Sequence, residues 1–197
     1  MKVLALGGSG GMGRFSSFAI SNYPNITKVT IADLNEDNAK EFSNLFDDRF
    51  TGIGLDVTDK EHLEKVMSGH DIVLNTTGPF FKFGLPILKS AIKCKCHYFD
   101  ICDDWEPTEE MLKLNDEALK SEITAIVGLG ASPGISNLLG LKAMNELDKT
   151  ESIITGWDVS SAKPEDESSQ KGTNAAMEHG LQPVSYTHLR AHETYPH

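Results

Sequence analysis

The glycine-rich segment near the N-terminus constrains the fold more than any other feature of this chain. Residues 8–13 read Gly-Ser-Gly-Gly-Met-Gly and match the pattern G-x-G-x-x-G. The segment directly follows an apolar run over 2–7 and opens a helix expected over 12–21. A strand, a glycine turn and a helix in this order are typical of a parallel α/β unit, because glycines let the helix pack closely on the strand.

Short apolar runs alternate with amphipathic stretches through the first 130 residues. The expected strands are 2–7, 28–33, 51–56, 71–75, 97–101 and 123–127, and the expected helices are 12–21, 36–46, 59–68, 85–93 and 108–121. This alternation predicts an α/β fold with a doubly wound, parallel, Rossmann-type sheet that helices cover on both faces. A helix over 135–147, with leucines available for burial, and a strand over 152–159 then suggest the start of a second α/β domain.

We expect three parts along the chain: a dinucleotide-binding domain over 1–134, a connecting helix with the truncated start of a substrate domain over 135–183, and a tail over 184–197. The tail contains the string SYTHLRAHET, which resembles translated adaptor sequence. We therefore interpret the tail as non-native and exclude it from fold reasoning. The alternative is a native mobile tail.

Composition excludes several classes of function. Acidic residues outnumber basic ones by 29 to 18, a net charge of −11, which argues against a sequence-independent grip on nucleic-acid phosphates. No apolar run reaches the length of a membrane span, and the apolar start is too short for a signal peptide. Three cysteines are too few for a disulfide scaffold. The sequence therefore predicts a cytoplasmic protein with no nucleic-acid or membrane partner.

The glycine segment and an acidic residue after the second strand form a dinucleotide-binding fingerprint. Gly8 is expected to permit the tight turn, Gly10 to let the backbone approach a pyrophosphate, and Gly13 to let the helix pack on the strand. Asp33 ends the second expected strand, 20 residues after Gly13. The free N–H groups at the helix start would then hold the phosphates. The alternative is a glycine-rich turn that binds nothing.

Asp33 also predicts the kind of cofactor. Its carboxylate would accept hydrogen bonds from the adenosine ribose hydroxyls and repel a 2′-phosphate, so we expect NAD rather than NADP. The residues that follow it contain no arginine, and Arg14 is the one arginine able to reach the adenosine end. Asp33 could also serve as a helix N-cap.

Two further loops lie at the carboxyl edge of the expected sheet, where ligands bind in open α/β folds. Asp56 and Val57 end the third strand, where a carboxylate meets adenine or, equally, acts as an N-terminal helix charge. The loop after the fourth strand offers threonine hydroxyls to ribose or nicotinamide, and Phe80 a wall for the pocket. The cofactor-binding candidates are Gly8, Ser9, Gly10, Gly11, Met12, Gly13, Asp33, Asp56, Val57, Thr76, Thr77, Gly78 and Pro79.

Four segments together resemble a known family, the saccharopine dehydrogenase-like NAD(P)-binding proteins. These segments read VLALGGSGGMGR, DIVLNTTGPFFKFGLPILKSAI, HYFDICDDWEP and GLGASPGISNLLG, and the resemblance extends over about residues 1–158. It implies an N-terminal Rossmann domain, a second α/β domain that supplies much of the substrate site, and an NAD(P)-dependent oxidoreductase. Such enzymes transfer hydride at a C–N (amine/imine) centre of an amino-acid-like or polyamine-like substrate.

The resemblance also implies positions for the site. Gly8, Gly10, Gly13 and Asp33 would hold the dinucleotide, and Thr77, Gly78 and Pro79 would lie by the nicotinamide ribose. The residues expected on the substrate side are Phe80, Asp100, Ser132, Pro133 and Gly134, and the catalytic candidates are Asp100 and Cys102. Most substrate residues would lie beyond this chain, and a homodimer would form through the second domain.

Two alternatives bear on function. Cys94, Cys96, His97, Asp100 and Cys102 lie close together in the sequence, but their spacing does not suit a tetrahedral metal site, so we expect no metal. The same Rossmann domain could instead belong to a non-catalytic dinucleotide-binding sensor or regulatory protein. The native continuation of the chain would separate the enzyme from the sensor.

Overall fold

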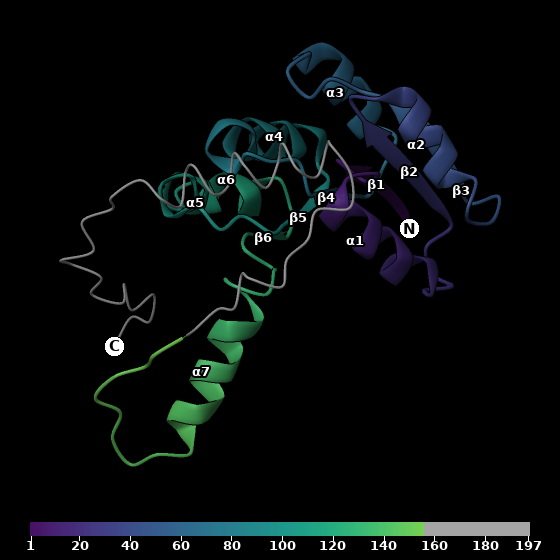
Figure 1. Cartoon of the computed structure of the whole chain (residues 1–197). Helices are drawn as coiled ribbons and strands as arrows, with labels where there is room; N and C mark the ends of the chain where they lie inside the picture. Colours follow the sequence, from purple (N-terminus) through teal and green to yellow (C-terminus); the bar gives the residue numbers. More distant parts are fainter. Residues whose placement is uncertain (156–197) are drawn as a thin grey trace.

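The computed structural model describes residues 1–155, which form an α/β domain with a helix beyond it (Figure 1). The strands are β1 (Lys2–Leu6), β2 (Lys28–Asp33), β3 (Phe50–Gly54), β4 (Ile72–Asn75), β5 (His97–Asp100) and β6 (Ala125–Ile126). The helices are α1 (Gly11–Ser21), α2 (Glu36–Ser43), α3 (Lys60–Met67), α4 (Phe80–Cys94), α5 (Trp105–Leu112), α6 (Asn115–Lys120) and α7 (Ile135–Asn145). None of these helices is long and apolar enough to cross a bilayer.

The strands form one parallel sheet in the order β3-β2-β1-β4-β5-β6. This confirms the predicted doubly wound, Rossmann-type α/β fold. The strand order reverses between β1 and β4, and at such a switch point the connections leave in opposite directions. A crevice therefore opens at the carboxyl edge, outside the ends of these two strands.

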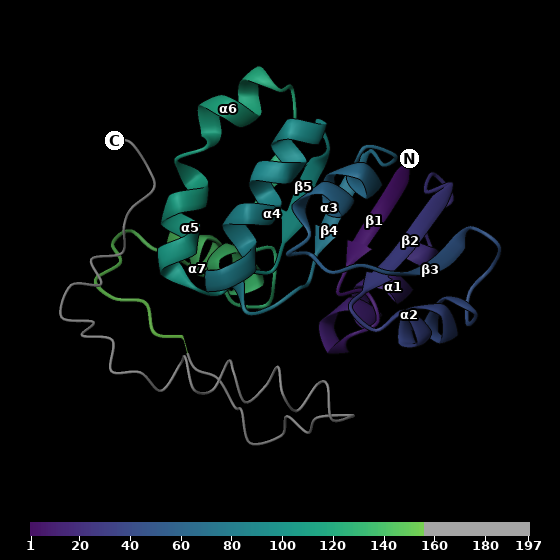
Figure 2. The same cartoon turned by 90° about the horizontal axis from the view of Figure 1, so that it is seen from above.

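Two hydrophobic cores cover the two faces of the sheet. Residues of α1 and α2 pack on one face, against alternate side chains of β1 and β2 such as Val29 and Ile31. Residues of α3, α4, α5 and α6 pack on the other face, against Leu4, Leu6 and Val73. Figure 2 shows the two groups of helices on opposite sides of the strands. Each central strand is thus buried from both sides, as its continuous apolar sequence predicts.

Short polar side chains mark the starts of two helices. Asn35 accepts a hydrogen bond from the N–H of Asn38 at 3.1 Å and begins α2. Asp59 accepts one from the N–H of His62 at 3.1 Å and begins α3, at a position that the sequence pattern predicts. Such caps satisfy N–H groups that have no partner within the helix.

The fourth and fifth helices differ from the expected ranges. Helix α4 starts at Phe80 rather than at residue 85, and the N–H of Phe83 already donates to the carbonyl of Pro79 at 3.1 Å. Pro86 lies inside the helix, where burial of Ile87 and Leu88 outweighs the one backbone hydrogen bond that proline cannot make. The helix expected over 108–121 divides into α5 and α6 at a turn around Leu114.

The sequence suggests burial of the leucines around α7, but the structure leaves them unburied. Leu138 and Leu139 in α7, and Leu147 just beyond its end, are 60–66% exposed, and no residue of α7 is buried. The helix projects away from the sheet (Figure 1), and Ile153 of the segment that follows approaches it at Gly140 without burying any of its residues. Of the strand expected over 152–159, residues 152–155 have no regular structure and the rest lies outside the described residues. The predicted tail over 184–197 also lies outside them.

Replacing Phe42 with alanine should lower the free energy of unfolding by about 3–5 kcal/mol. The ring is 1% exposed and packs edge-on against Phe18 and Phe46, so its removal leaves a cavity between α2 and the sheet. Urea unfolding measures the change. Phe15→Ala is the matched control: Phe15 is 66% exposed on the neighbouring helix, and its loss should change stability by less than about 0.5 kcal/mol. Equal effects of the two variants would contradict this packing.

Candidate functional site

The turn after β1 is made by Gly7 rather than by Gly8. Gly7 has a φ of +66°, which glycine adopts at little cost, whereas Gly8 has no positive φ. The N–H groups of both glycines donate to the carbonyl of Ala32, at 2.9 and 3.3 Å. The assignment of the tight turn to Gly8 is therefore wrong by one residue. The signal was present in the sequence, because two glycines stand side by side at the end of the strand.

Helix α1 begins unusually close to this turn. A Cβ atom at Gly13 would lie 2.1 Å from the carbonyl oxygen of Gly7, so no other residue fits there without moving the helix. No acceptor within residues 1–155 takes the N–H groups of Gly11, Met12 or Gly13. These donors, together with the positive end of the helix dipole, form a cradle that fits a phosphate group.

Asp33 and Ser9 meet beside this cradle. The hydroxyl of Ser9 donates to Asp33 Oδ2 at 2.6 Å, and the N–H of Asn35 donates to Oδ1 at 3.4 Å. The N-cap of α2 is Asn35, so Asp33 does not cap that helix with its side chain. Arg14 joins the group, since its Nε donates to the carbonyl of Ser9 at 3.1 Å and its guanidinium lies 4.9 Å above the ring of Phe42.

The loop after β4 lies against the same turn. The N–H and the hydroxyl of Thr76 both donate to the carbonyl of Leu6 at 2.9 Å, which joins the ends of β1 and β4. The hydroxyl of Thr77 is buried and has no hydrogen-bond partner among residues 1–155. An unpartnered hydroxyl at this place fits a ligand that supplies its partner, because a buried polar group without one is costly.

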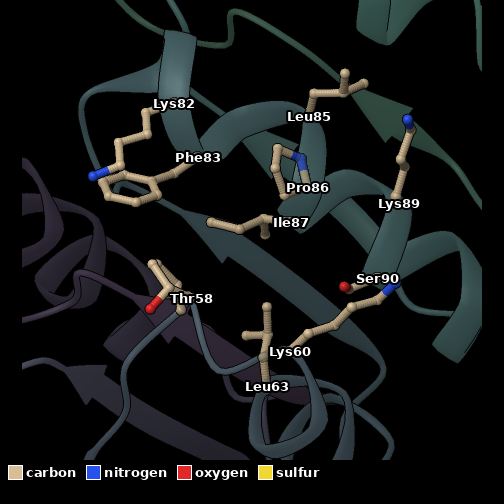
Figure 3. A pocket seen from close by; sticks show the side chains of 11 residues that line it. Thr58, Lys60, Leu63, Lys82, Phe83, Leu85, Pro86, Ile87, Lys89 and Ser90 are labelled. Carbon is tan, nitrogen blue, oxygen red and sulfur yellow. The ribbon is translucent and has the colours of Figure 1, made fainter.

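Val57 lines a groove of about 410 Å³ between α3 and α4, and Asp56 immediately precedes it in the chain. Asp56 accepts hydrogen bonds from the side chain and the N–H of Thr58, at 2.7 and 2.8 Å, and these bonds lower the pKa of its carboxyl group. Figure 3 shows the floor formed by Leu63 and Ile87 and the lysines at the rim. This turn therefore lies beside an open, partly apolar hollow, which suits a loop expected next to an adenine ring.

The two catalytic candidates do not face the crevice. Asp100 and Cys102 are both 0% exposed. Asp100 accepts hydrogen bonds from the Tyr98 hydroxyl at 2.8 Å and from the N–H groups of Cys102 at 3.0 Å and Gly128 at 2.8 Å. These three protein donors occupy the carboxylate of Asp100, which therefore holds the surrounding loops in place. The expectation that Asp100 lies on the substrate side of the site does not fit this buried position.

Phe80, expected to form a wall of the cofactor pocket, lies in the core instead. Phe80 is 7% exposed and belongs to the core under α4, whereas Phe81 is 50% exposed. Both start the helix, so the one-residue difference of about 100° turns Phe80 inward. Ser132, Pro133 and Gly134 lie in a compact turn after β6, held by a hydrogen bond of 3.0 Å from the N–H of Gly130 to the carbonyl of Pro133.

Within residues 1–155, no group of three or more histidine, cysteine or acidic side chains is arranged to hold a metal ion. Burial raises the pKa of Cys96 and of Cys102 to about 11. Both thiols therefore stay protonated near neutral pH. The nitrogen Nδ1 of His97 accepts from the N–H of Thr124 at 2.9 Å, on the other side of the strand from Asp100.

The fold and the site define a Rossmann-type dinucleotide-binding protein: a parallel sheet with a switch point, a glycine cradle at a helix start, and a carboxylate after β2. The family model described as "Saccharopine dehydrogenase NADP binding domain" matches residues 3–126, more than half of the chain. The chain belongs to this family.

Curated relatives agree with this assignment. The chain is 29% identical over 105 residues to a saccharopine dehydrogenase [NADP(+), L-glutamate-forming] of Schizosaccharomyces pombe, a match that covers 53% of this chain and 22% of the relative. The same enzyme of Saccharomyces cerevisiae is 31% identical over 97 residues, 49% of this chain and 21% of the relative. The matched part thus spans about a fifth of each relative.

A solved structure of the yeast protein has a similar fold. The apo saccharopine dehydrogenase (L-Glu forming) of Saccharomyces cerevisiae matches with a TM-score of 0.63 and 28% identity. The match covers 74% of this chain and 31% of that one. A myo-inositol dehydrogenase described as putative, from Sinorhizobium meliloti, has a TM-score of 0.52 at 17% identity and supports the fold alone.

The expectation of NAD is wrong, because the family model and the curated relatives are described as NADP-binding or NADP-dependent. The inference rested on Asp33 repelling a 2′-phosphate. In the structure one oxygen of this carboxylate already accepts from the Ser9 hydroxyl, and the cationic side chain of Arg14 is bonded to the same serine. The carboxylate therefore does not determine the local charge alone.

The thiols provide a test of the buried site. At pH 8 a thiol of pKa about 11 is ionised in roughly one molecule in a thousand, so Cys96 and Cys102 should resist iodoacetamide in the native protein. Cys94 is partly exposed and should be alkylated first. Mass spectrometry of the peptides reads the order of labelling, and the same reaction in urea, where all three cysteines should react, is the control. Labelling of Cys102 as fast as Cys94 would contradict its buried position.

Proposed function

We propose that this chain binds NADP(H) across the carboxyl edge of its sheet. The observation that carries the proposal is the set of unpaired N–H groups at Gly11, Met12 and Gly13, which face the turn after β1. They offer donors to the pyrophosphate, and the Thr77 hydroxyl offers a further partner on the β4 side. The residues proposed to hold the cofactor are Gly8, Ser9, Gly10, Gly11, Met12, Gly13, Asp33, Asp56, Val57, Thr76, Thr77, Gly78 and Pro79.

Arg14 is the proposed partner of the 2′-phosphate. Its Nε is bonded to the carbonyl of Ser9, next to Asp33, and its two terminal nitrogens have no hydrogen-bond or ion-pair partner within residues 1–155. Its guanidinium carbon lies over the Phe42 ring, 4.9 Å from the ring centre, and this cation–π contact restrains the side chain. A planar cation held in this way suits a phosphate oxygen pair.

We further propose that the complete protein is an NADP-dependent oxidoreductase that acts at a C–N bond of an amino-acid-like substrate. The activity for which its curated relatives are named supports this, and the matched part covers about a fifth of their length. When bound, the nicotinamide exchanges a hydride with the carbon of an amine or imine. The residues of this chain bind and orient the cofactor, and the substrate site would come from a second domain.

The organisation of the chain is part of the same proposal. Residues 1–134 would be the cofactor domain, and residues 135–183 would lead into the substrate domain. The exposed leucines of α7 support this division, since a helix with apolar residues on its surface is typical of a segment that packs against another domain. A cytoplasmic location and a homodimer formed through the second domain complete the proposal.

Calorimetric titration of the purified chain with NADPH and, separately, with NADH tests the cofactor proposal. NADPH should bind more tightly than NADH, and Gly13→Ala should abolish the binding of both, since its Cβ would displace the helix start. Gly69→Ala is the control, because a Cβ there meets nothing closer than 3.6 Å. Absence of NADPH binding to the wild-type chain would overturn the proposal.

Arg14→Ala should raise the dissociation constant of NADPH about tenfold and leave that of NADH within about twofold. The two ligands differ only in the 2′-phosphate, so the difference isolates that contact. Lys28→Ala is the matched control, since it removes a positive charge at the amino end of β2, the edge of the sheet opposite the site. Equal weakening of NADPH and NADH in Arg14→Ala would show that Arg14 does not bind the 2′-phosphate.

The enzymatic proposal is tested on the full-length native protein. It should oxidise NADPH when an amine and a carbonyl compound that condense to an imine are supplied together. Tight NADPH binding without turnover on any amino-acid-like pair would favour a sensor or regulatory protein instead.

A further inference from the structure

A buried chain of hydrogen bonds runs across the ends of β4, β5 and β6. Asn75 Nδ2 donates to the Tyr98 hydroxyl at 3.0 Å, and the Tyr98 hydroxyl donates to Asp100 Oδ2 at 2.8 Å. Asp100 Oδ1 then accepts from the N–H groups of Cys102 and Gly128. Asn75, Tyr98 and Asp100 are each 0% exposed, so water does not replace any of these partners.

Each end of this chain holds a loop at the carboxyl edge. Asn75 Oδ1 accepts from the N–H of Thr77 at 3.0 Å, which fixes the loop after β4. Asp100 fixes the loop after β5 through Cys102 and the loop after β6 through Gly128, and its own carbonyl accepts from Leu129 at 2.7 Å. One connected group of side chains therefore joins three loops that are far apart in the sequence.

These loops belong to one half of the dinucleotide crevice. In a doubly wound fold the strands form two mononucleotide-binding halves, and the crevice runs across both. The glycine cradle, Ser9 and Asp33 lie on the β1–β2–β3 half, where the proposed site would hold the adenosine. The loops fixed by Asn75 and Asp100 lie on the β4–β5–β6 half, where it would hold the nicotinamide.

In this hydrogen-bond network Asn75 donates to Tyr98, and Tyr98 donates to the carboxylate of Asp100. Every group that contacts Asp100 donates to it, so the network needs an acceptor at both of its oxygens. An asparagine at this position would direct an NH₂ group either at the Tyr98 hydroxyl or at two backbone N–H groups. In the first case the Tyr98 hydroxyl would meet the NH₂ groups of Asn75 and of the new asparagine and would lose the acceptor for its own proton. In the second case the new NH₂ group would lie against the N–H groups of Cys102 and Gly128, which are also donors.

We propose that Asp100 is a positioning residue: through Tyr98 and Asn75 it assembles the nicotinamide half of the cofactor site, without touching the cofactor. The inference rests on the proposed NADP site. It assigns Asp100 a role that is neither catalytic nor substrate-binding, and it separates the two halves of the site. Loss of this network should weaken contacts to the nicotinamide half and leave the adenosine half intact.

The test compares two ligands on the full chain by calorimetry: NADPH, and 2′,5′-ADP, which occupies only the adenosine half. In Asp100→Asn the dissociation constant of NADPH should rise about tenfold, while that of 2′,5′-ADP should stay within about twofold. Tyr98→Phe removes only the hydroxyl and should give a smaller loss in the same direction. If Asp100→Asn does not fold, Tyr98→Phe decides the question.

Met67→Ala is the matched control for general destabilisation. Met67 is 0% exposed, but it ends α3 at the amino edge of the sheet, away from the network. It should lower stability without a selective loss of NADPH affinity. Equal weakening of both ligands in Tyr98→Phe, or no weakening of either, would overturn the inference. A wild-type chain that binds neither ligand would instead refute the proposed function.

Discussion

The close approach of helix α1 to the turn after β1 is the constraint on which the cofactor edge depends. No side chain fits at Gly13, because a Cβ atom there would lie 2.1 Å from the carbonyl oxygen of Gly7. This contact sets where the helix begins and which way its first N–H groups point. At the same turn the N–H groups of Gly7 and Gly8 donate to the carbonyl of Ala32, and the N–H of Thr76 donates to the carbonyl of Leu6. The ends of β1, β2 and β4 are thereby joined around the start of one helix.

The two halves of the site are held by different kinds of interaction. Backbone contacts and small residues fix the adenosine half, where Ser9 also donates a side-chain hydrogen bond of 2.6 Å to Asp33. Buried polar side chains fix the nicotinamide half through Asn75, Tyr98 and Asp100. Burial raises the pKa of the Asp100 carboxyl group and the hydrogen bonds that it accepts oppose this, so its charge is tolerated only while all its donors stay in place.

Much of the fold followed from the sequence because its elements have strong local signals. The apolar strands, the glycine turn and the cap at Asp59 are each encoded within a few residues. The start of α4 was missed because Gly84 and Pro86 suggest a break, and only the burial of the helix outweighs it. The expected burial of the α7 leucines depended on a partner that residues 1–155 do not contain.

The candidate site was predicted less completely, because burial and charge depend on neighbours that are distant in the sequence. The resemblance suggested that Asp100 and Cys102 line the reactive side of the cleft, but the sequence could not show that both side chains are fully buried. The choice of NAD failed for a similar reason. A single carboxylate after β2 does not reveal that Ser9 bonds to it and that Arg14 is held alongside.

Nuclear magnetic resonance of the ¹⁵N-labelled chain, recorded with and without NADPH, shows which amides the cofactor contacts. The largest amide shifts should occur at Gly11, Met12 and Gly13 and at Thr76 and Thr77, with smaller shifts at Gly128 and Leu129. Amides at the amino edge of the sheet, such as that of Lys28, should not move. Saturable binding with shifts confined to the groove between α3 and α4, and none at the glycine turn, would contradict it.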